Sequence, residues 1–585
     1  YDAIEAAFNS SSGHTHDGTS AEGAPIEVLG PSQDVVITAS AIRPKTDNAV
    51  DLGTSSLKFK DLYLDGTMNL DSISVTDPDG TDATVRLNGN YPDGARNIAF
   101  GLTALDSLDG SSPGGDNIAL GNAALTALTT GDHNIAIGSS AGDALTTGGK
   151  NIAIGHEALS TEDGNGESVA IGYQALKTQN AGASGLNVAV GYQAGTAVTT
   201  GVKNVIVGAS AGVALAAGAN NVAIGYEALS TEDGHGHNVA IGHQALKVQD
   251  AGADAYNIAI GSGAGAANTT GIANVFIGGV AGDVNTTGSR NIAIGLNALG
   301  SNTVGSKSVA IGDATLDAQN PGSATDMFNT AVGHSAGGAV STGINNTFIG
   351  GLAGSANTTA SENTAVGKNS LLGNTTGTAN TGTGMASVAN TTTGSYNSGF
   401  GRSALLQNIT GSNNTAMGYE SLKNSSTADN NIGIGYQSLL SNTTGDSNVA
   451  VGTLALDANT TGQRNVAVGS QALSTETQGR FSTAVGYSAL EATNSTSTVD
   501  SYNVGLGYKA GEATSTGVKN TFVGGLSGLN NVGASFNTAV GFSSLSANTT
   551  GTGNVAVGFA LGANTTANDN TAMGNGALGS NTTGA

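Results

Sequence analysis

Two pairs of histidines in this 585-residue chain have a spacing that could hold a metal ion. His14 and His16 lie in "GHTHDG", and His235 and His237 lie in "GHGH". Residues two apart on a strand point to the same side, so each pair could present two imidazoles together. Imidazole suits iron, zinc and nickel. For His14 and His16 the alternative is a polar linker turn, which the Asp-Gly that follows them favours.

The pair His235 and His237 has counterparts that contain no histidine. Seventy residues earlier the chain reads "TEDGNGES", with Asn165 and Ser168 in the corresponding stretch, and later it reads "SNTVGSKS". His237 also directly precedes a repeated motif that begins at Asn238. We therefore interpret this pair as part of a variable turn rather than as a metal site.

Acidic turns are a second group of candidate metal ligands. Glu162-Asp163-Gly164, Glu232-Asp233-Gly234 and "DPDGTD" at 77–82 each bring two or more carboxylates together. Two carboxylates with backbone carbonyls make at best a weak calcium site. We expect these segments to be solvated turns.

Catalysis, nucleic-acid binding and membrane insertion find no support in the composition. The chain has no cysteine, and no carboxylate pair or Ser-His-Asp constellation stands out from the repeats. Its net charge is −24, with only 19 Lys and Arg residues, whereas phosphate binding needs clustered basic side chains. No apolar run approaches the roughly 20 residues of a membrane-spanning helix. We expect a protein that is not an enzyme and requires no cofactor.

The elements that carry these residues belong to a repeat. The unit N-x-A-[IV]-G, with variants, begins at Asn97 and recurs 28 times, the last at Asn570, mostly 17 residues apart. Glycine, at 91 residues, punctuates segments rich in Val and Ile. This period predicts a β-solenoid whose coils each contain two strands of about five residues and two turns. Stacked at about 4.8 Å, the coils would form a rod of roughly 130 Å.

Each position of the motif predicts a structural role. The first is Asn in all but three turns, which predicts a ladder of stacked amides. The fourth is apolar in every turn except the one with Thr383, so we expect it to face the core together with the second. The fifth is Gly, which predicts a positive φ, and the Gly of the Thr-Thr-Gly turns is expected for the same reason.

Two further columns vary together. The third position, usually Ala, is large at Ile206, Phe276, Phe348 and Phe522, where the residue after the motif Gly is small. Elsewhere that following residue is often a ring, such as Tyr173 or His243. We hypothesise that these two positions share one space of fixed volume. The ring column itself could stack on sugars, but we favour a packing ladder.

The repeats of residues 97–585 resemble the head repeats of trimeric YadA-like adhesins, although the coils of that family are shorter. The resemblance implies left-handed parallel β-rolls, with three chains around a threefold axis.

The segments "GHTHDGTSAEGAPI" and "IRPKTDNAVDLGTSSLKFKDLYLDGTMNL" resemble bacteriophage tail fibres. We therefore divide the chain into a linker with the HTHDG motif (1–26), a small fibre β-module (27–75), a transition (76–96) and the solenoid shaft (97–585). In a trimer, His14 and His16 would bring six imidazoles to one axis, enough for an octahedral divalent ion such as iron, zinc or nickel.

The resulting expectation is a structural virion protein: an extracellular, homotrimeric tail-fibre shaft that extends a receptor-binding tip for host attachment. Its partners would be other virion tail proteins and, through a tip beyond residue 585, a host-cell receptor. One alternative is a bacterial cell-surface trimeric adhesin with a YadA-like head. A less favoured alternative is an ice-binding solenoid, suggested by the Thr-rich turns.

Overall fold

The computed structural model describes residues 97–107, 115–164 and 166–583, together with the backbone of three short strands nearer the N-terminus. These strands are β1 (Val28–Leu29), β2 (Val35–Ile37) and β3 (Ile42–Pro44), which form an antiparallel sheet in the order β1-β2-β3. The chain divides into two compact units, Tyr1–Arg86 and Leu87–Ala585. His14, His16 and the acidic segment 77–82 lie outside the described residues.

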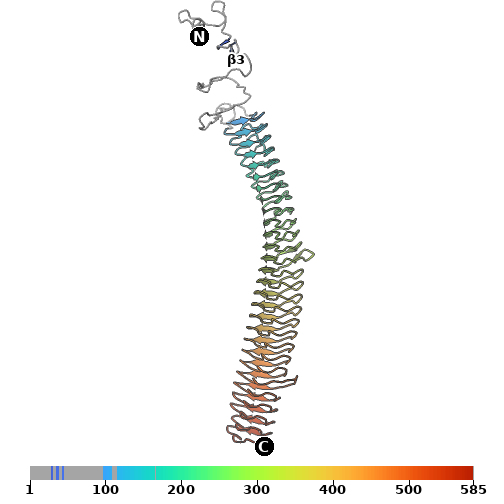
Figure 1. The fold of residues 1–585 in the computed structure, drawn as a ribbon, viewed down its shortest axis with the longest axis vertical. Coiled ribbons are helices and arrows are strands. Elements are labelled where there is room, and N and C mark those ends of the chain that lie inside the picture. The colour runs from blue at the N-terminus through green and yellow to red at the C-terminus, as the bar shows by residue number, and fades with distance from the viewer. Residues whose placement is uncertain are drawn as a thin grey trace, which may run out of the picture. The chain divides into compact units, whose positions relative to one another are not determined.

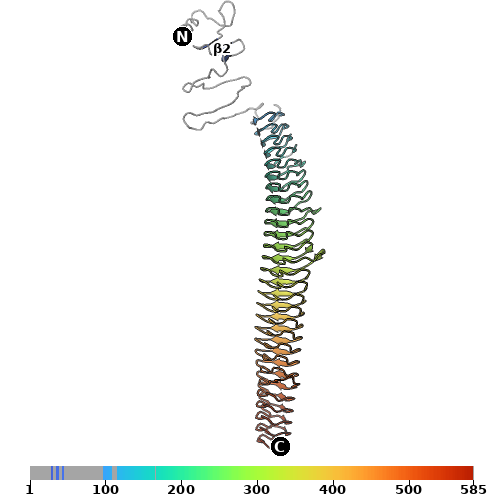
Figure 2. The same ribbon diagram turned by 45° about the vertical axis from the view of Figure 1, so that its right-hand side comes forward.

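The second unit is a parallel β-solenoid of 28 coils, a long and gently curved stack (Figures 1 and 2). Its described residues form strands and turns and no helix, which confirms the all-β prediction and the 17-residue period. Each coil contributes one three-residue strand. The strands are β4 (Ile98–Phe100), β5 (Ile118–Leu120), β6 (Ile135–Ile137), β7 (Ile152–Ile154), β8 (Val169–Ile171), β9 (Val188–Val190), β10 (Val205–Val207), β11 (Val222–Ile224), β12 (Val239–Ile241), β13 (Ile258–Ile260), β14 (Val275–Ile277), β15 (Ile292–Ile294), β17 (Val309–Ile311), β19 (Thr330–Val332), β20 (Thr347–Ile349), β21 (Thr364–Val366), β22 (Thr381–Thr383), β23 (Ser398–Phe400), β24 (Thr415–Met417), β25 (Ile432–Ile434), β26 (Val449–Val451), β27 (Val466–Val468), β28 (Thr483–Val485), β29 (Val504–Leu506), β30 (Thr521–Val523), β31 (Thr538–Val540), β32 (Val555–Val557) and β33 (Thr571–Met573).

All these strands form one ladder in which equivalent motif positions pair. Ile135 of β6 pairs with Ile152 of β7, for example, and the same register joins each strand to the next. β4 pairs only with β5 and β33 only with β32, so the ladder is open at both ends. Two longer turns add a small parallel pair, β16 (Gly305–Ser306) and β18 (Thr325–Asp326).

The prediction of a second strand in each coil is wrong. The limb that follows the motif Gly is a series of turns, in which the second and fourth residues have left-handed φ angles. In one coil these are Glu157 and Leu159, both at φ 52°. Two such residues in four bend the backbone away from the extended conformation that a ladder needs.

The predicted orientation of the strand is also wrong, because the third motif position faces the core. Ala136 and Ala170 are fully buried, whereas Ile135 and Ile152 on the same ladder are only partly buried. The core is completed from the opposite limb by an Ala and a Leu per typical coil, such as Leu159. The Ile and Val side chains of the second and fourth motif positions lie on the outer face of the ladder, and the third position supplies the core.

The Asn ladder is confirmed, although most of its bonds go to the backbone. Asn134 Oδ1 accepts a hydrogen bond from the backbone N–H of Asn151 at 3.0 Å. Its Nδ2 donates to the carbonyl of Gly148 at 2.9 Å, across the same coil. A typical amide of this ladder therefore satisfies one group of the next coil and one of its own turn.

Glycine is required for different reasons at the fifth motif position and in the Thr-Thr-Gly turn. The motif Gly has the predicted positive φ, for example 133° at both Gly138 and Gly225. The Gly of the Thr-Thr-Gly turn is not in that region, so this part of the prediction is wrong. At Gly201 a Cβ atom would instead overlap the carbonyl oxygen of Gly218 in the next coil. Close stacking of turns, rather than backbone conformation, excludes side chains there.

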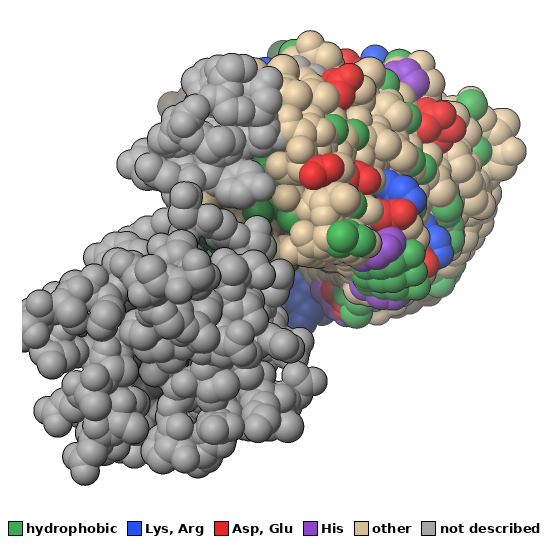
Figure 3. All heavy atoms as spheres, turned by 90° about the horizontal axis from the view of Figure 1, so that it is seen from above, with side chains coloured by type: hydrophobic (Ala, Val, Ile, Leu, Met, Phe, Trp, Pro, Cys, Tyr) green, Lys and Arg blue, Asp and Glu red, His purple; other side chains and the backbone are tan. Residues whose placement is uncertain are grey.

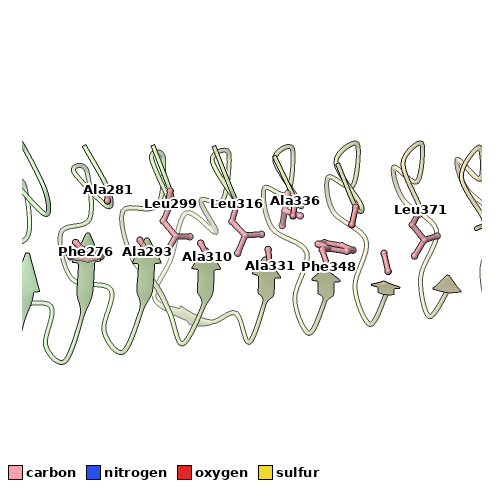
Figure 4. Close-up of a cluster of buried hydrophobic side chains, with 14 of the residues drawn as sticks. Phe276, Ala281, Ala293, Leu299, Ala310, Leu316, Ala331, Ala336, Phe348 and Leu371 are labelled. Carbon is pink, nitrogen blue, oxygen red and sulfur yellow. The ribbon is translucent and has the colours of Figure 1, made fainter. Parts of the chain in front are cut away.

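The compensation between large and small residues is real, but its predicted partner is wrong. A Cβ atom added to Gly351, the residue after the motif Gly, would contact nothing within 4 Å. The buried ring of Phe348 instead fills the space where a Leu would stand, since Cβ atoms at Gly337 and Gly354 would meet this ring. Figure 4 shows Phe276 and Phe348 extending from strands, and Leu299, Leu316 and Leu371 reaching into the same core from the other limb.

Candidate functional site

The outer face of the strand ladder carries a long column of apolar side chains in the described part of the solenoid. The second and fourth motif positions point outward along all 28 strands. Several large side chains in these columns are 36–71% exposed: Phe100, Ile137, Val205, Ile258, Ile260, Ile311, Ile349, Phe400, Met417, Ile432, Val485, Val540 and Met573. A continuous apolar surface of this kind marks an interaction site in a soluble protein.

The ring column forms short exposed stacks on the turn that follows each strand. His156, Tyr173 and Tyr192 stack in sequence, with ring centroids 5.5 and 5.2 Å apart. Tyr226 and His243 form a similar pair at 5.6 Å. Stacked rings cover one another's faces, and a sugar needs such a face, so the geometry fits the packing interpretation.

Ion pairs accompany the ring column. Lys247 Nζ lies 2.7 Å from Glu227 Oε2, and the amide of Gln244 also donates to this carboxylate. Hydrogen bonds from Lys247, Gln244 and Tyr226, in that order, lower the pKa of Glu227 to about 2. Seen from above, the described part of the chain carries hydrophobic, acidic, basic and histidine side chains close together on one side (Figure 3).

A buried polar column, which the sequence did not predict, runs inside the turn limb. Asn285 Nδ2 donates to Asn268 Oδ1 at 2.6 Å, and Asn374 Nδ2 donates to Asn357 Oδ1 at 2.9 Å, each pair one coil apart. Residues three before the turn Gly form this column. The recurring "Asn-Thr-Thr-Gly" was the signal that could have revealed it.

Three glutamates, Glu162, Glu232 and Glu476, occupy the same column and are fully buried. The expectation that the acidic turns are solvated is therefore wrong for Glu162 and Glu232. It holds for the neighbouring Asp163 and Asp233, which are exposed. A buried carboxylate needs hydrogen-bond donors or a cation to offset its lost hydration.

His235 and His237 contact different groups. His237 stacks on Tyr256 with centroids 4.8 Å apart, and its Nε2 lies 3.8 Å from Asp254. His235 points to Glu232, with 3.5 Å between Nδ1 and Oε1. The two imidazoles therefore do not form a metal-binding pair, but Glu232, Asp233, His235 and Asp250 bring four ligand atoms within 4.8 Å of one another.

The Thr-rich turns direct their first hydroxyl along the rod. Thr129 Oγ1 donates to the carbonyl of Thr146 at 3.0 Å, and Thr286 Oγ1 donates to that of Thr303 at 2.9 Å. These hydroxyls bond to the protein, and so they are poorly placed to order a layer of ice.

Comparisons with known proteins identify no relative. No protein-family description, no curated protein and no solved structure matches the chain. In the described part of the chain no helix is long and apolar enough to cross a membrane.

Proposed function

We propose that this chain is the shaft of a homotrimeric fibre that assembles through the outer face of its strand ladder. The observation that carries the proposal is the position of the large aliphatic residues. In a solitary solenoid the Ala column is inside, while Ile and Val columns such as Ile137 and Ile260 stay partly exposed along the whole stack.

Association of identical chains would cover this surface along its entire length. The fourth motif position places an apolar side chain on every coil except the one with Thr383, whereas the second position is Val or Ile in many coils and Thr or Ser in the others. Parallel copies in register can therefore match each other coil by coil. Burying apolar area stabilises by about 25 cal/mol per Å². Even a modest area per coil, summed over the stack, supplies a large association energy. The resemblance to YadA-like heads implies three copies around an axis. In that arrangement the outer faces of the three strand ladders would be buried against one another.

The mechanical properties suit a spacer. The backbone ladder runs without interruption from β4 to β33, and most coils add buried Ala, Leu and Asn groups. Stability in such a stack grows by nearest-neighbour terms. A net charge of −24 also reduces nonspecific association with other polyanions.

A virion tail fibre is the context that the N-terminal segments favour, because their resemblance to phage fibres is long and specific. The shaft would hold a receptor-binding tip away from the particle, with other tail proteins at its opposite end. A bacterial trimeric adhesin is the second candidate, and the resemblance of the repeats to adhesin heads supports it. Immunogold labelling of phage particles or bacterial surfaces would distinguish the two.

Light scattering on the full chain tests the assembly. We expect a mass of three chains of 56.9 kDa. Replacing Ile260 and Ile294 by Lys on the outer face should reduce the mass toward one chain. The matched control, Tyr173→Lys in the ring column, should leave it unchanged. A wild-type mass of one chain would refute the proposed assembly.

A further inference from the structure

The three buried glutamates of the polar column differ in how their carboxylates are satisfied. Glu476 accepts hydrogen bonds from the backbone N–H groups of Gln478, Gly479 and Ser495, and from the Ser495 hydroxyl at 3.1 Å. Its negative charge is therefore solvated by four donors inside the coil.

Glu162 is satisfied by a side chain from the next coil. The Nε2 of Gln179 donates to Glu162 Oε2 at 3.0 Å and to the Ser168 hydroxyl at 2.9 Å. The same Gln accepts a bond from Asn187 through its Oε1. One amide thus links the carboxylate to the Asn ladder.

Glu232 has the corresponding Gln, Gln249, but not the corresponding bond. Its Oε1 accepts the N–H of His235 at 3.1 Å, and its buried Oε2 has no partner. Three more buried atoms at this level also lack partners: His235 Nδ1, Asn238 Nδ2 and Gln249 Nε2. The Oε1 of Gln249 already accepts from Asn257 and Asn268, so turning its amide round would break those bonds.

The sequence difference between the two coils coincides with this change. His235 stands where the Glu162 coil has Asn165, three residues after the glutamate. Asp250, from the next coil, and Asp233 complete a group whose ligand atoms all lie within 4.8 Å of one another. Glu232 is fully buried, His235 is half-buried, and the two aspartates are exposed and free to adjust.

We propose that Glu232, His235, Asp233 and Asp250 bind one divalent transition-metal ion of the zinc class. Around such an ion, with bonds of about 2.0–2.2 Å, neighbouring ligand atoms lie about 3.3–3.6 Å apart. The 3.5 Å between His235 Nδ1 and Glu232 Oε1 fits this geometry. An imidazole ligand favours zinc, cobalt or nickel over calcium or magnesium.

The ion would join two coils, since Asp250 belongs to the coil after that of Glu232. Its two positive charges would also offset most of the negative charge of three crowded carboxylates. Burial first, and then the charges of Asp250 and Asp233, raise the pKa of Glu232 to about 7, although His235 acts in the opposite direction.

Equilibrium dialysis of the full chain against Zn²⁺ tests the site. All proteins would carry His14→Ala and His16→Ala, which removes the other candidate metal site. We expect this background to bind one more equivalent of Zn²⁺ per chain than His235→Asn or Glu232→Gln, and its affinity to fall at least about tenfold in Asp250→Asn. The matched control Glu162→Gln should bind as much as the background.

His235→Asn recreates the residue of the Glu162 coil, so it should fold, and circular dichroism would verify this. Co²⁺ in place of Zn²⁺ should give visible absorption bands that disappear in His235→Asn. Equal zinc binding by the background and by both His235→Asn and Glu232→Gln would overturn the proposal, and water or a proton would then occupy the gap.

Discussion

The exchange of core volume between Phe348 and Gly354 gives the sharpest prediction about packing. Phe348 is fully buried, and its ring occupies the space that a Leu from the turn limb fills in most coils. Replacing Phe348 by Ala should remove about 3–5 kcal/mol of local stability, as for other buried Phe residues. Replacing Gly354 by Leu alone should cost about 1–3 kcal/mol, because the new side chain would overlap the ring.

The double variant should be much more stable than the sum of these losses. Gly354 has φ 59°, which disfavours Leu in general, but Leu371 at the equivalent position of the next coil has φ 50°. The backbone therefore accepts Leu, and only the ring excludes it. With Ala at 348, Leu at 354 recreates the common coil, and we expect a favourable coupling of about 2–3 kcal/mol.

Hydrogen exchange measured by mass spectrometry is the appropriate assay, since it reports the opening of coils 329–380 separately from the rest of the stack. A solenoid need not unfold in two states, so a single melting temperature would average over many coils. Strictly additive losses in the double variant would refute the reasoning. Unchanged protection in Gly354→Leu alone would refute it as well.

Three other substitutions test separate parts of the structure. Gly201→Ala should destabilise its coil, because the new Cβ would overlap the Gly218 carbonyl. Gly351→Tyr should have little effect, since a Cβ atom there would contact nothing within 4 Å, and local hydrogen exchange of the two variants would show the contrast. Asn448→Ala should cost about 1–3 kcal/mol for each of the two bonds it removes, to the Asn465 N–H and the Gly462 carbonyl, and local hydrogen exchange would measure this loss. Burial raises the pKa of Asp457 from 3.8 to about 6, so its contribution to stability is complete below pH 3.8 and is lost as the pH rises through about 6. Asp457→Asn should therefore increase the hydrogen-exchange protection of its coil at pH 7 but not at pH 3.5, and an equal increase at both would contradict this assignment.

The regular features of the fold were predictable from the sequence because each is repeated in nearly every coil. The spacing from Asn134 to Asn151 gives the coil length, and the invariant Gly at 138 marks the end of the strand. Both carry a specific physical requirement: an amide that bonds to the next coil, and a φ that disfavours side chains. Because the same residue types recur at these positions in nearly every coil, their pattern could be recognised in a single sequence.

The orientation of the strands could not be predicted in the same way. Side chains alternate between the two faces of a strand, but three residues are too few to show which face is apolar. The central Ala is small enough to lie either in the core or on the outside. Ile135 and Ile137 are large and aliphatic, and such residues on a strand normally indicate the face toward the core. The flat coil instead buries Ala136, and the aliphatic side chains lie outside.

The candidate metal group was hidden for a related reason. Glu232, His235 and Asp233 are close in sequence, but Asp250 joins them only because a coil of this solenoid places it one turn above. Glu232 is buried because it belongs to the polar column inside the turn limb. The next residue, Asp233, is exposed, so the acidic composition of this turn does not indicate that one carboxylate is buried. His237, equally suggestive in sequence, points instead to Tyr256.

Electron cryomicroscopy of the assembled shaft tests the central claim most directly. A cross-section should contain three chains, with the outward columns that include Ile137 and Ile260 buried against neighbouring copies and the ring column facing solvent. A rod one chain wide, with those aliphatic columns exposed along its length, would contradict the proposed assembly.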